Sequence, residues 1–158
     1  MPRKKTASLK RQLKPDMQYN SVLVQRMINK VMKEGKKRKA EKLVYAALEQ
    51  AAEKAKKDPM EIFEAAIKNT SPNVQVKSRR VGGANYQVPM EVKPDRKIHY
   101  AMIWMLNAAR NKEGKSFDKR LANELLDAYN NQGDAIKKKL DTHQMAEANK
   151  AFAHFAKY

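Results

Sequence analysis

The chain has 158 residues, 34 of them Lys or Arg and only 17 Asp or Glu, so its formal net charge is +17. This length fits a single domain that buries about 70% of the surface of the unfolded chain, and so large a positive charge favours a polyanionic partner, most simply a nucleic acid. The chain has no cysteine and no apolar run of about 18 residues, which excludes disulfides, cysteine metal sites and a membrane-spanning helix. We therefore expect a cytoplasmic nucleic-acid-binding protein that does not contact a membrane.

The first fifteen residues show no helical or strand periodicity and no acidic residue before Asp16. Their cations are Arg3, Lys4, Lys5, Lys10, Arg11 and Lys14. This pattern predicts a disordered basic arm over 1–15, followed by one helical domain over 16–158. A tail that merely improves solubility is the alternative interpretation.

Three helices are expected before the middle of the chain. The first spans about 20–33, and the second carries an apolar stripe from Ala40 to Ala51 that recurs every three to four residues. The third opens with Asp58-Pro59, an N-cap followed by proline in the first turn, and Ser71-Pro72 ends it.

A β-hairpin is predicted over 73–92, with Gly82-Gly83 at its turn. A two-residue loop would place Val74 and Val76 on a face with Glu91 and Pro89, which mixes apolar with polar side chains. A three-residue loop, Val81 to Gly83, separates them, so the pattern favours that register. It predicts an apolar face that includes Tyr86 and a donor face with Lys77, Arg79, Asn85 and Gln87. Pro89 has no N–H and must lie where the ladder is open.

Three more helices follow the hairpin. They begin at Pro94, Ser116 and Asp134, and the last is expected to carry Phe152 and Phe155. The predicted fold is therefore a mostly α, six-helix single domain with one projecting two-stranded antiparallel ribbon between the third and fourth helices.

Catalytic patterns are missing from the sequence. His99, His143 and His154 lack the spacing of zinc ligands or of a general base, and no phosphate-binding glycine loop occurs. We therefore expect neither an enzyme nor a metal site nor a cofactor.

The basic clusters are the candidate functional residues. Lys36 to Lys39 lie at the start of the second helix, where free N–H groups and the helix dipole favour a phosphate, although lysines on a helix are often only solvated. Tyr86 could stack on a base near the ribbon tip, whereas Tyr100 and Trp104 lie on an apolar helix stripe and are expected to pack in the core.

Separate motifs along the chain resemble those of the bacterial small-subunit ribosomal protein seven family. The motifs are Ser78-Arg79-Arg80-Val81-Gly82-Gly83-Ala84, Tyr86-Gln87-Val88-Pro89, Gly35-Lys36-Lys37 and the stretch from Asp141 to Phe152, together with Arg96, Trp104, Lys115-Ser116 and Arg120-Leu121-Ala122. The resemblance covers nearly the whole chain and keeps the order of the motifs.

The resemblance implies a structural component of the small ribosomal subunit that acts in translation. Such a protein binds the 3′ major domain of 16S rRNA directly and nucleates assembly of the 30S head. It lies at the subunit interface near the decoding centre and the exit-site tRNA, whose exit it can block, and near mRNA. Its protein neighbours are small-subunit proteins nine and eleven, and it is not expected to form a homo-oligomer.

Charge clusters and resemblance together give the candidate rRNA contacts. They are Arg3, Lys4, Lys5, Lys10, Arg11, Lys36, Lys37, Arg38, Lys77, Arg79, Arg80, Arg96, Lys115 and Arg120. The ribbon-tip residues expected near tRNA and mRNA are Arg79, Arg80, Gly82, Gly83, Asn85 and Tyr86. A DNA-architectural protein that uses the ribbon as a minor-groove wedge is the alternative.

Overall fold

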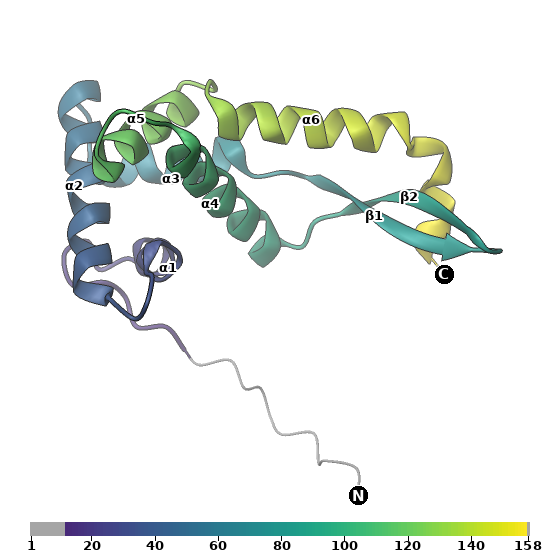
Figure 1. The fold of residues 1–158 in the computed structure, drawn as a ribbon, viewed down its shortest axis with the longest axis horizontal. Helices are drawn as coiled ribbons and strands as arrows, with labels where there is room; N and C mark the ends of the chain where they lie inside the picture. Colours follow the sequence, from purple (N-terminus) through teal and green to yellow (C-terminus); the bar gives the residue numbers. More distant parts are fainter. Residues whose placement is uncertain (1–11, 158) are drawn as a thin grey trace, which may run out of the picture.

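The computed structural model describes residues 12–157, which form a helical body and a long β-ribbon that projects from it (Figure 1). The elements are α1 (Val22–Val31), α2 (Lys37–Ala55), α3 (Pro59–Thr70), β1 (Val74–Val81), β2 (Ala84–Glu91), α4 (Pro94–Asn111), α5 (Phe117–Tyr129), α6 (Asp134–Ala148) and a 3-10 helix, η1 (Lys150–Lys157). The predicted fold class is confirmed, with η1 as an additional element. Residues 1–11 of the predicted basic arm lie outside the described residues.

The body is built around α5, against which α2, α3 and α4 pack. The apolar stripes predicted for these helices form one core, in which Phe63, Leu48, Met102 and Leu121 are almost fully buried. Trp104 packs against the core, as its helix stripe predicts. Tyr100 stacks on Trp104 at a ring separation of 5.8 Å, but its hydroxyl donates to Gln75 of the ribbon at 2.9 Å, so it lies toward the ribbon and not in the core. Among residues 12–157, no helix has the length and apolar character needed to cross a membrane.

Two aspartates organise the starts of helices. Asp58 caps α3 by accepting hydrogen bonds from the N–H groups of Met60 (2.9 Å) and Glu61 (3.1 Å), as its sequence position predicts. Asp16 is only 4% exposed and accepts from the N–H groups of Tyr19 and Ser21, both at 2.8 Å. Burial alone would raise the pKa of Asp16, but these backbone hydrogen bonds outweigh it and lower the pKa.

A buried carboxylate, that of Glu124 in α5, joins α5 to the start of α6. Glu124 is fully buried; one oxygen accepts from the backbone N–H of Ala135 at 3.0 Å, and the other accepts from Lys112 Nζ at 2.6 Å. Burial acts to lower the pKa of Lys112, but its contacts with Glu124 and Asp127 prevail and raise it. Gly133 passes beside this cluster with φ of +90°, and a Cβ there would lie 2.9 Å from Asp127 Cβ.

The ribbon has a two-residue loop, so the predicted three-residue loop is wrong. Val81 pairs with Ala84, and both Gly82 (φ +57°) and Gly83 (φ +90°) are left-handed, which suits the tight turn that matches the twist of a hairpin. Arg79 therefore faces the same side as its partner Tyr86, and Arg80 shares the opposite side with Asn85.

Pro89 meets the expectation made for it. The N–H of Val92 donates to the carbonyl of Asn73, and hydrogen-bonded pairs alternate with open ones along an antiparallel ladder. Pro89, which pairs with Val76, consequently occupies an open position where no N–H is needed.

The C-terminal segment covers the ribbon face on which polar Arg79 lies beside apolar Tyr86. The expected continuous sixth helix is wrong, because α6 ends at Ala148 and η1 folds back against β2 (Figure 1). Phe152 and Phe155 of η1 lie 5.2 and 5.1 Å from the Tyr86 ring, centroid to centroid, and Arg79 donates to the carbonyl of Phe155 at 3.3 Å. The predicted register had grouped the apolar side chains of the two strands on one face. In the structure, Tyr86 obtains its apolar contacts from η1 instead.

Candidate nucleic-acid interface

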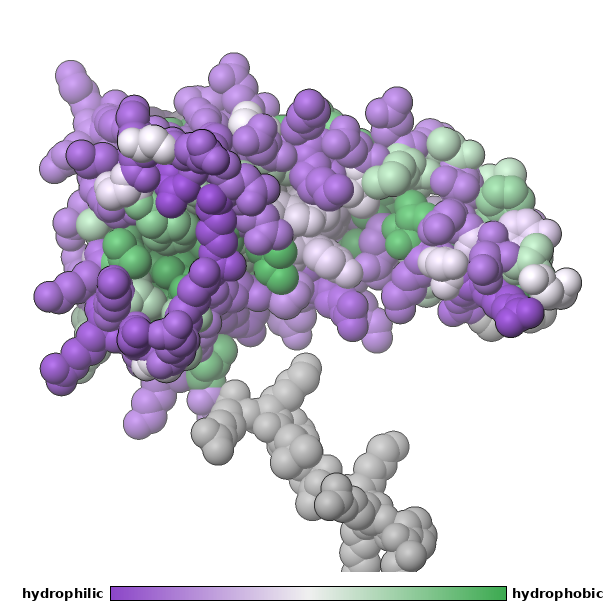
Figure 2. Space-filling view, in the orientation of Figure 1, coloured by the Kyte–Doolittle hydropathy of each residue, from purple (hydrophilic) through white to green (hydrophobic). Residues whose placement is uncertain are grey.

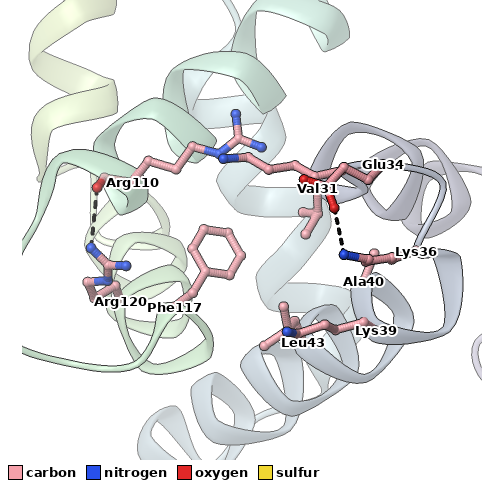
Figure 3. Close-up of a pocket in the computed structure, with 10 residues that line it drawn as sticks. Val31, Glu34, Lys36, Lys39, Ala40, Leu43, Arg110, Phe117 and Arg120 are labelled. Carbon is pink, nitrogen blue, oxygen red and sulfur yellow. Dashed lines mark hydrogen bonds and ion pairs between the residues drawn. The ribbon is translucent and has the colours of Figure 1, made fainter.

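A basic hollow opens between α1, α2, α4 and α5. Its cavity has a volume of about 480 Å³, and its cations are Lys33, Lys36, Lys39, Arg110 and Arg120. One carboxylate, that of Glu34, also lines it and lies 2.5 Å from Lys36 Nζ. Its apolar residues are Val31, Ala40, Leu43 and Phe117. Figure 3 shows side chains from separate helices converging on this space, and Figure 2 shows an apolar area bordered by hydrophilic residues on this part of the body. We call this site the basic hollow.

The N-terminus of α2 forms one wall of the basic hollow. Its N-cap residue, Lys36, has no acceptor atom with which to cap the helix, and the first turn carries no acidic residue. Cations at the positive end of a helix dipole are unfavourable on their own. Lys36 pairs with Glu34 (2.5 Å) and Lys37 with Glu41 (3.6 Å), but neither carboxylate caps the helix. A bound phosphate would accept from the uncapped N–H groups, so this end of α2 is suited to an anion.

Arg120 forms the opposite wall and holds the end of α4. Its Nη1 donates to the carbonyls of Arg110 (3.2 Å) and Lys112, which are exposed where α4 ends. Its Nε is buried and has no hydrogen-bond partner among the residues that the structure describes. Arg120 is thus fixed in position while keeping one donor free.

Arg110 is a residue that the sequence interpretation missed. It is a single cation in the last turn of α4, with no neighbouring basic cluster to mark it. Its side chain donates to the carbonyl of Lys30 at 3.3 Å, which links α4 to α1 beside the basic hollow. Only the packing of α4 against α1 brings it near Lys36, and no local sequence signal predicts that.

A second groove runs between α1 and α4. It has a volume of about 460 Å³ and is lined by Leu13, Arg26, Asn29, Lys30, Asp95, Ile98, His99 and Met102. Lys30 Nζ lies 2.8 Å from His99 Nδ1. Burial, and then the nearby charges of Lys30 and Arg96, lower the pKa of His99. The ring therefore stays neutral and accepts from Lys30 at neutral pH.

The predicted residues fall into three groups. Lys36 and Arg120 line the basic hollow, while Lys37, Arg38 and Lys115 are exposed on α2 or in the loop before α5. Arg96 is exposed in the first turn of α4. The arm residues Arg3, Lys4, Lys5, Lys10 and Arg11 lie outside the part of the chain that the structure describes.

The ribbon residues also separate, though not as predicted. Ser78, Arg80, Asn85 and Gln87 share one exposed face, whereas Arg79 and Tyr86 are half-buried on the other face beside η1. The predicted face that joins Lys77 and Arg79 with Asn85 and Gln87 is wrong, because Lys77 and Arg79 pair with Val88 and Tyr86 on the opposite side. Lys77 itself is exposed. Tyr86 packs against two phenylalanines, so one of its ring faces is not free to stack on a base. Arg80 and Asn85 remain the accessible donors near the tip.

The histidines do not gather into a chemical site. Within residues 12–157, no three His, Asp or Glu side chains come together as metal ligands would. His143 Nε2 instead accepts from the backbone N–H of Asn73 at 3.1 Å and so ties α6 to the base of the ribbon. The surface chemistry of the described chain is dominated by cations.

Known proteins of one family match this chain over nearly its full length. The family model described as ribosomal protein S7p/S5e matches residues 2–150. A small ribosomal subunit protein uS7 from Chloroflexus aggregans is 57% identical over 157 residues, which cover 99% of each chain. Proteins of the same name from Roseiflexus castenholzii and a second Roseiflexus strain are 57% and 55% identical over 158 residues, with complete coverage of both chains.

Proposed function

The chain belongs to the ribosomal protein S7p/S5e family, and from this membership we propose that it binds the 3′ major domain of 16S rRNA in the head of the small subunit. As a member of this family it is a structural ribosomal protein and not an enzyme. The observation that carries the finer proposal is the basic hollow, where five cations from α2, α4, α5 and the loop before α2 converge. Cations fixed by packing suit a folded polyanion.

The assembly role follows from how many elements the basic hollow joins. An RNA strand seated there would contact α2, α4 and α5 together, and the arm cations Arg3 to Arg11 would add phosphate contacts beyond the body. We propose that this combined surface anchors the protein and nucleates folding of the 30S head. The exposed cations Lys37, Arg38, Arg96 and Lys115 extend the same role.

The ribbon has a different role in this proposal. Its tip carries Arg80, Gly82, Gly83 and Asn85. The tip lies at the end of two eight-residue strands that project away from the helical body (Figure 1). We propose that it extends toward exit-site tRNA and mRNA at the subunit interface and limits tRNA release. Small-subunit proteins nine and eleven are the proposed protein neighbours.

The DNA-architectural alternative is not favoured by the ribbon. A minor-groove wedge needs an exposed apolar side chain at the point of insertion. Val81, Gly82, Gly83, Ala84 and Asn85 occupy this tip, and Tyr86 is packed against η1. Val81 is the one branched apolar side chain among these five, and it is partly buried and shorter than the Phe, Leu, Ile or Met side chains used as wedges.

Binding measurements over a range of salt concentrations test the anchor. We expect tight binding of an isolated head-domain rRNA fragment, with log affinity falling linearly in log salt by roughly 0.7–0.9 per phosphate contact. Lys36→Ala should reduce that slope by about one contact, whereas the exposed α3 variant Lys68→Ala should leave it unchanged. Equal affinity for random duplex DNA at matched salt would refute the proposal.

Deletion of the ribbon tests the division of roles. Replacing 77–87 by a short linker should leave affinity for the rRNA fragment nearly unchanged, because the basic hollow is intact. Ribosomes assembled with this variant should show altered occupancy of the exit site by tRNA. Failure of head assembly in the variant would show that the ribbon is part of the anchor.

A further inference from the structure

We infer that the basic hollow holds one unpaired, unstacked base of the RNA, in addition to phosphates. This inference rests on the proposed RNA-binding function and specifies what the site recognises. The observation behind it is that the surface between the five basic side chains is apolar. Leu43 and Phe117 are half-buried there beside the buried Val31 and Ala40, and the acidic lining residue, Glu34, is paired with Lys36 at 2.5 Å.

A phosphate alone does not account for this composition. A phosphate group is fully charged, so seating it on Leu43 and Phe117 would remove its hydration without returning hydrogen bonds. Sites for phosphate are built from N–H groups and cations, which the N-terminus of α2 and Lys36 already provide at one wall. Val31 and Ala40 already pack in the core, so it is the half-buried Leu43 and Phe117 whose remaining apolar surface suits an apolar partner.

A nucleobase has the matching chemistry. Its faces are apolar and stack on aromatic rings, while its edges carry hydrogen-bond acceptors. Phe117, the first residue of α5, points its ring into the space in Figure 3 and is only half-buried. The volume of about 480 Å³ lies within the roughly 300–1,000 Å³ range typical of sites for small ligands.

The unused donor of Arg120 gives a second, independent indication. A buried N–H without a partner is unfavourable, and most such groups in folded proteins find one. Within residues 12–157 the buried Nε of Arg120 has no partner, although Nη1 of the same side chain donates to the carbonyls of Arg110 and Lys112 where α4 ends. A turn of the Arg120 side chain that exposed Nε to the basic hollow would let an acceptor on the edge of a seated base, or on its sugar, supply the missing partner.

A base in a continuous helix cannot enter. Neighbouring bases cover both of its faces, and only its edges are accessible in the grooves. Such a base could not place a face against the apolar residues of the basic hollow. The basic hollow therefore selects a bulged or looped nucleotide, with its flanking phosphates held by the surrounding lysines and Arg110. Recognition would then depend on RNA shape as well as on charge.

The test uses the full-length protein and the isolated head-domain rRNA fragment. Each unpaired nucleotide is replaced in turn by an abasic residue, which keeps every phosphate. One such replacement should weaken binding to the wild type about tenfold, the size expected for one stacked base. The same replacement should have no further effect on Phe117→Leu, which itself binds the unmodified fragment about tenfold more weakly.

Two controls keep the result specific. Phe117→Tyr retains an aromatic ring and should restore the discrimination, and Tyr129→Leu, at the other end of α5, should behave like the wild type. Thermal midpoints of all variants show whether the fold is intact. If no abasic position distinguishes the wild type from Phe117→Leu, the inference is wrong while the proposed function stands. If the wild type does not bind the unmodified fragment in preference to duplex DNA, the proposed function itself is refuted, and the inference with it.

Discussion

The helical body and the ribbon are stabilised in different ways. The body surrounds a core in which Phe63, Ile62 and Leu121 are fully buried, and its helices support one another on several sides. The ribbon has only two strands, and it is held at its base by His143 and farther out by Phe152 and Phe155. Isolated two-stranded ribbons are marginal in water. The ribbon therefore depends on contacts with the C-terminal segment, whereas the body depends on its own interior.

The largest expected effect of a single change belongs to the body. Phe63→Ala should lower the free energy of unfolding by about 3–5 kcal/mol, because it leaves a cavity in a core that cannot collapse freely. Phe152→Ala, in the half-buried aromatic cluster on the ribbon, should cost about 1 kcal/mol. Urea unfolding of both variants measures the contrast. Equal costs would show that the ribbon cluster belongs to the same cooperative core.

The next effect concerns the buried carboxylate between body and α6. Glu124→Ala should destabilise the protein by about 3 kcal/mol, because it removes the partner of Lys112 and the acceptor for Ala135 N–H. Glu124→Gln keeps an oxygen for Ala135 and should cost less. Denaturant unfolding provides the measurement, with the exposed Glu64→Ala as control. A cost for Glu124→Ala no greater than that of the control would contradict this account.

A smaller effect is expected when the chain ends at Asn149. Loss of η1 removes both phenylalanines beside Tyr86 and the carbonyl that Arg79 contacts. Hydrogen exchange of the β1 and β2 amides should speed up about tenfold or more, while the amides of α3 and α5 exchange as before. Lys150→Ala, which removes only an exposed ion pair with Glu147, serves as control. Unchanged strand protection would show that the ribbon stands without η1.

The smallest effect depends on pH. The pKa of Asp16 is lower when folded than when unfolded, so its contribution to stability is complete above the usual carboxyl range and is lost as pH falls through the folded pKa. Asp16→Asn should cost about 1 kcal/mol at pH 7. That difference should shrink as the pH is lowered toward 2, as followed by urea unfolding. A cost that does not change with pH would mean that the charge of Asp16 is irrelevant.

Local signals were sufficient to predict the body. The apolar stripes of α2 and α4, the Asp58-Pro59 start of α3 and the Ser71-Pro72 stop all act within a few residues, so the sequence reveals them directly. The expectation for Pro89 succeeded for the same reason, since a missing N–H restricts a ladder wherever it occurs.

The ribbon and the basic hollow required information from distant segments. The predicted register was wrong because it assigned the ribbon's apolar face without the cover that Phe155 brings from the C-terminal end. Arg110 and Phe117 were not recognised as site residues because each looks like an ordinary helix-end residue until α1, α2 and α5 are packed together. Lys36 and Arg120 were predicted because charge runs and family motifs mark them locally.

The two-residue turn at Gly82 and Gly83 limits how the ribbon can change in length during evolution. Strands of eight residues extend about 26 Å at roughly 3.3 Å per residue. Adding one residue to each strand between Tyr86 and the body would turn Tyr86 to the opposite face, away from Phe152, because side chains alternate. Only paired insertions, two residues in each strand between Tyr86 and the body with the turn retained, would preserve the aromatic contact, provided that η1 moved outward too. The reach of the ribbon can thus vary only in steps of about 7 Å.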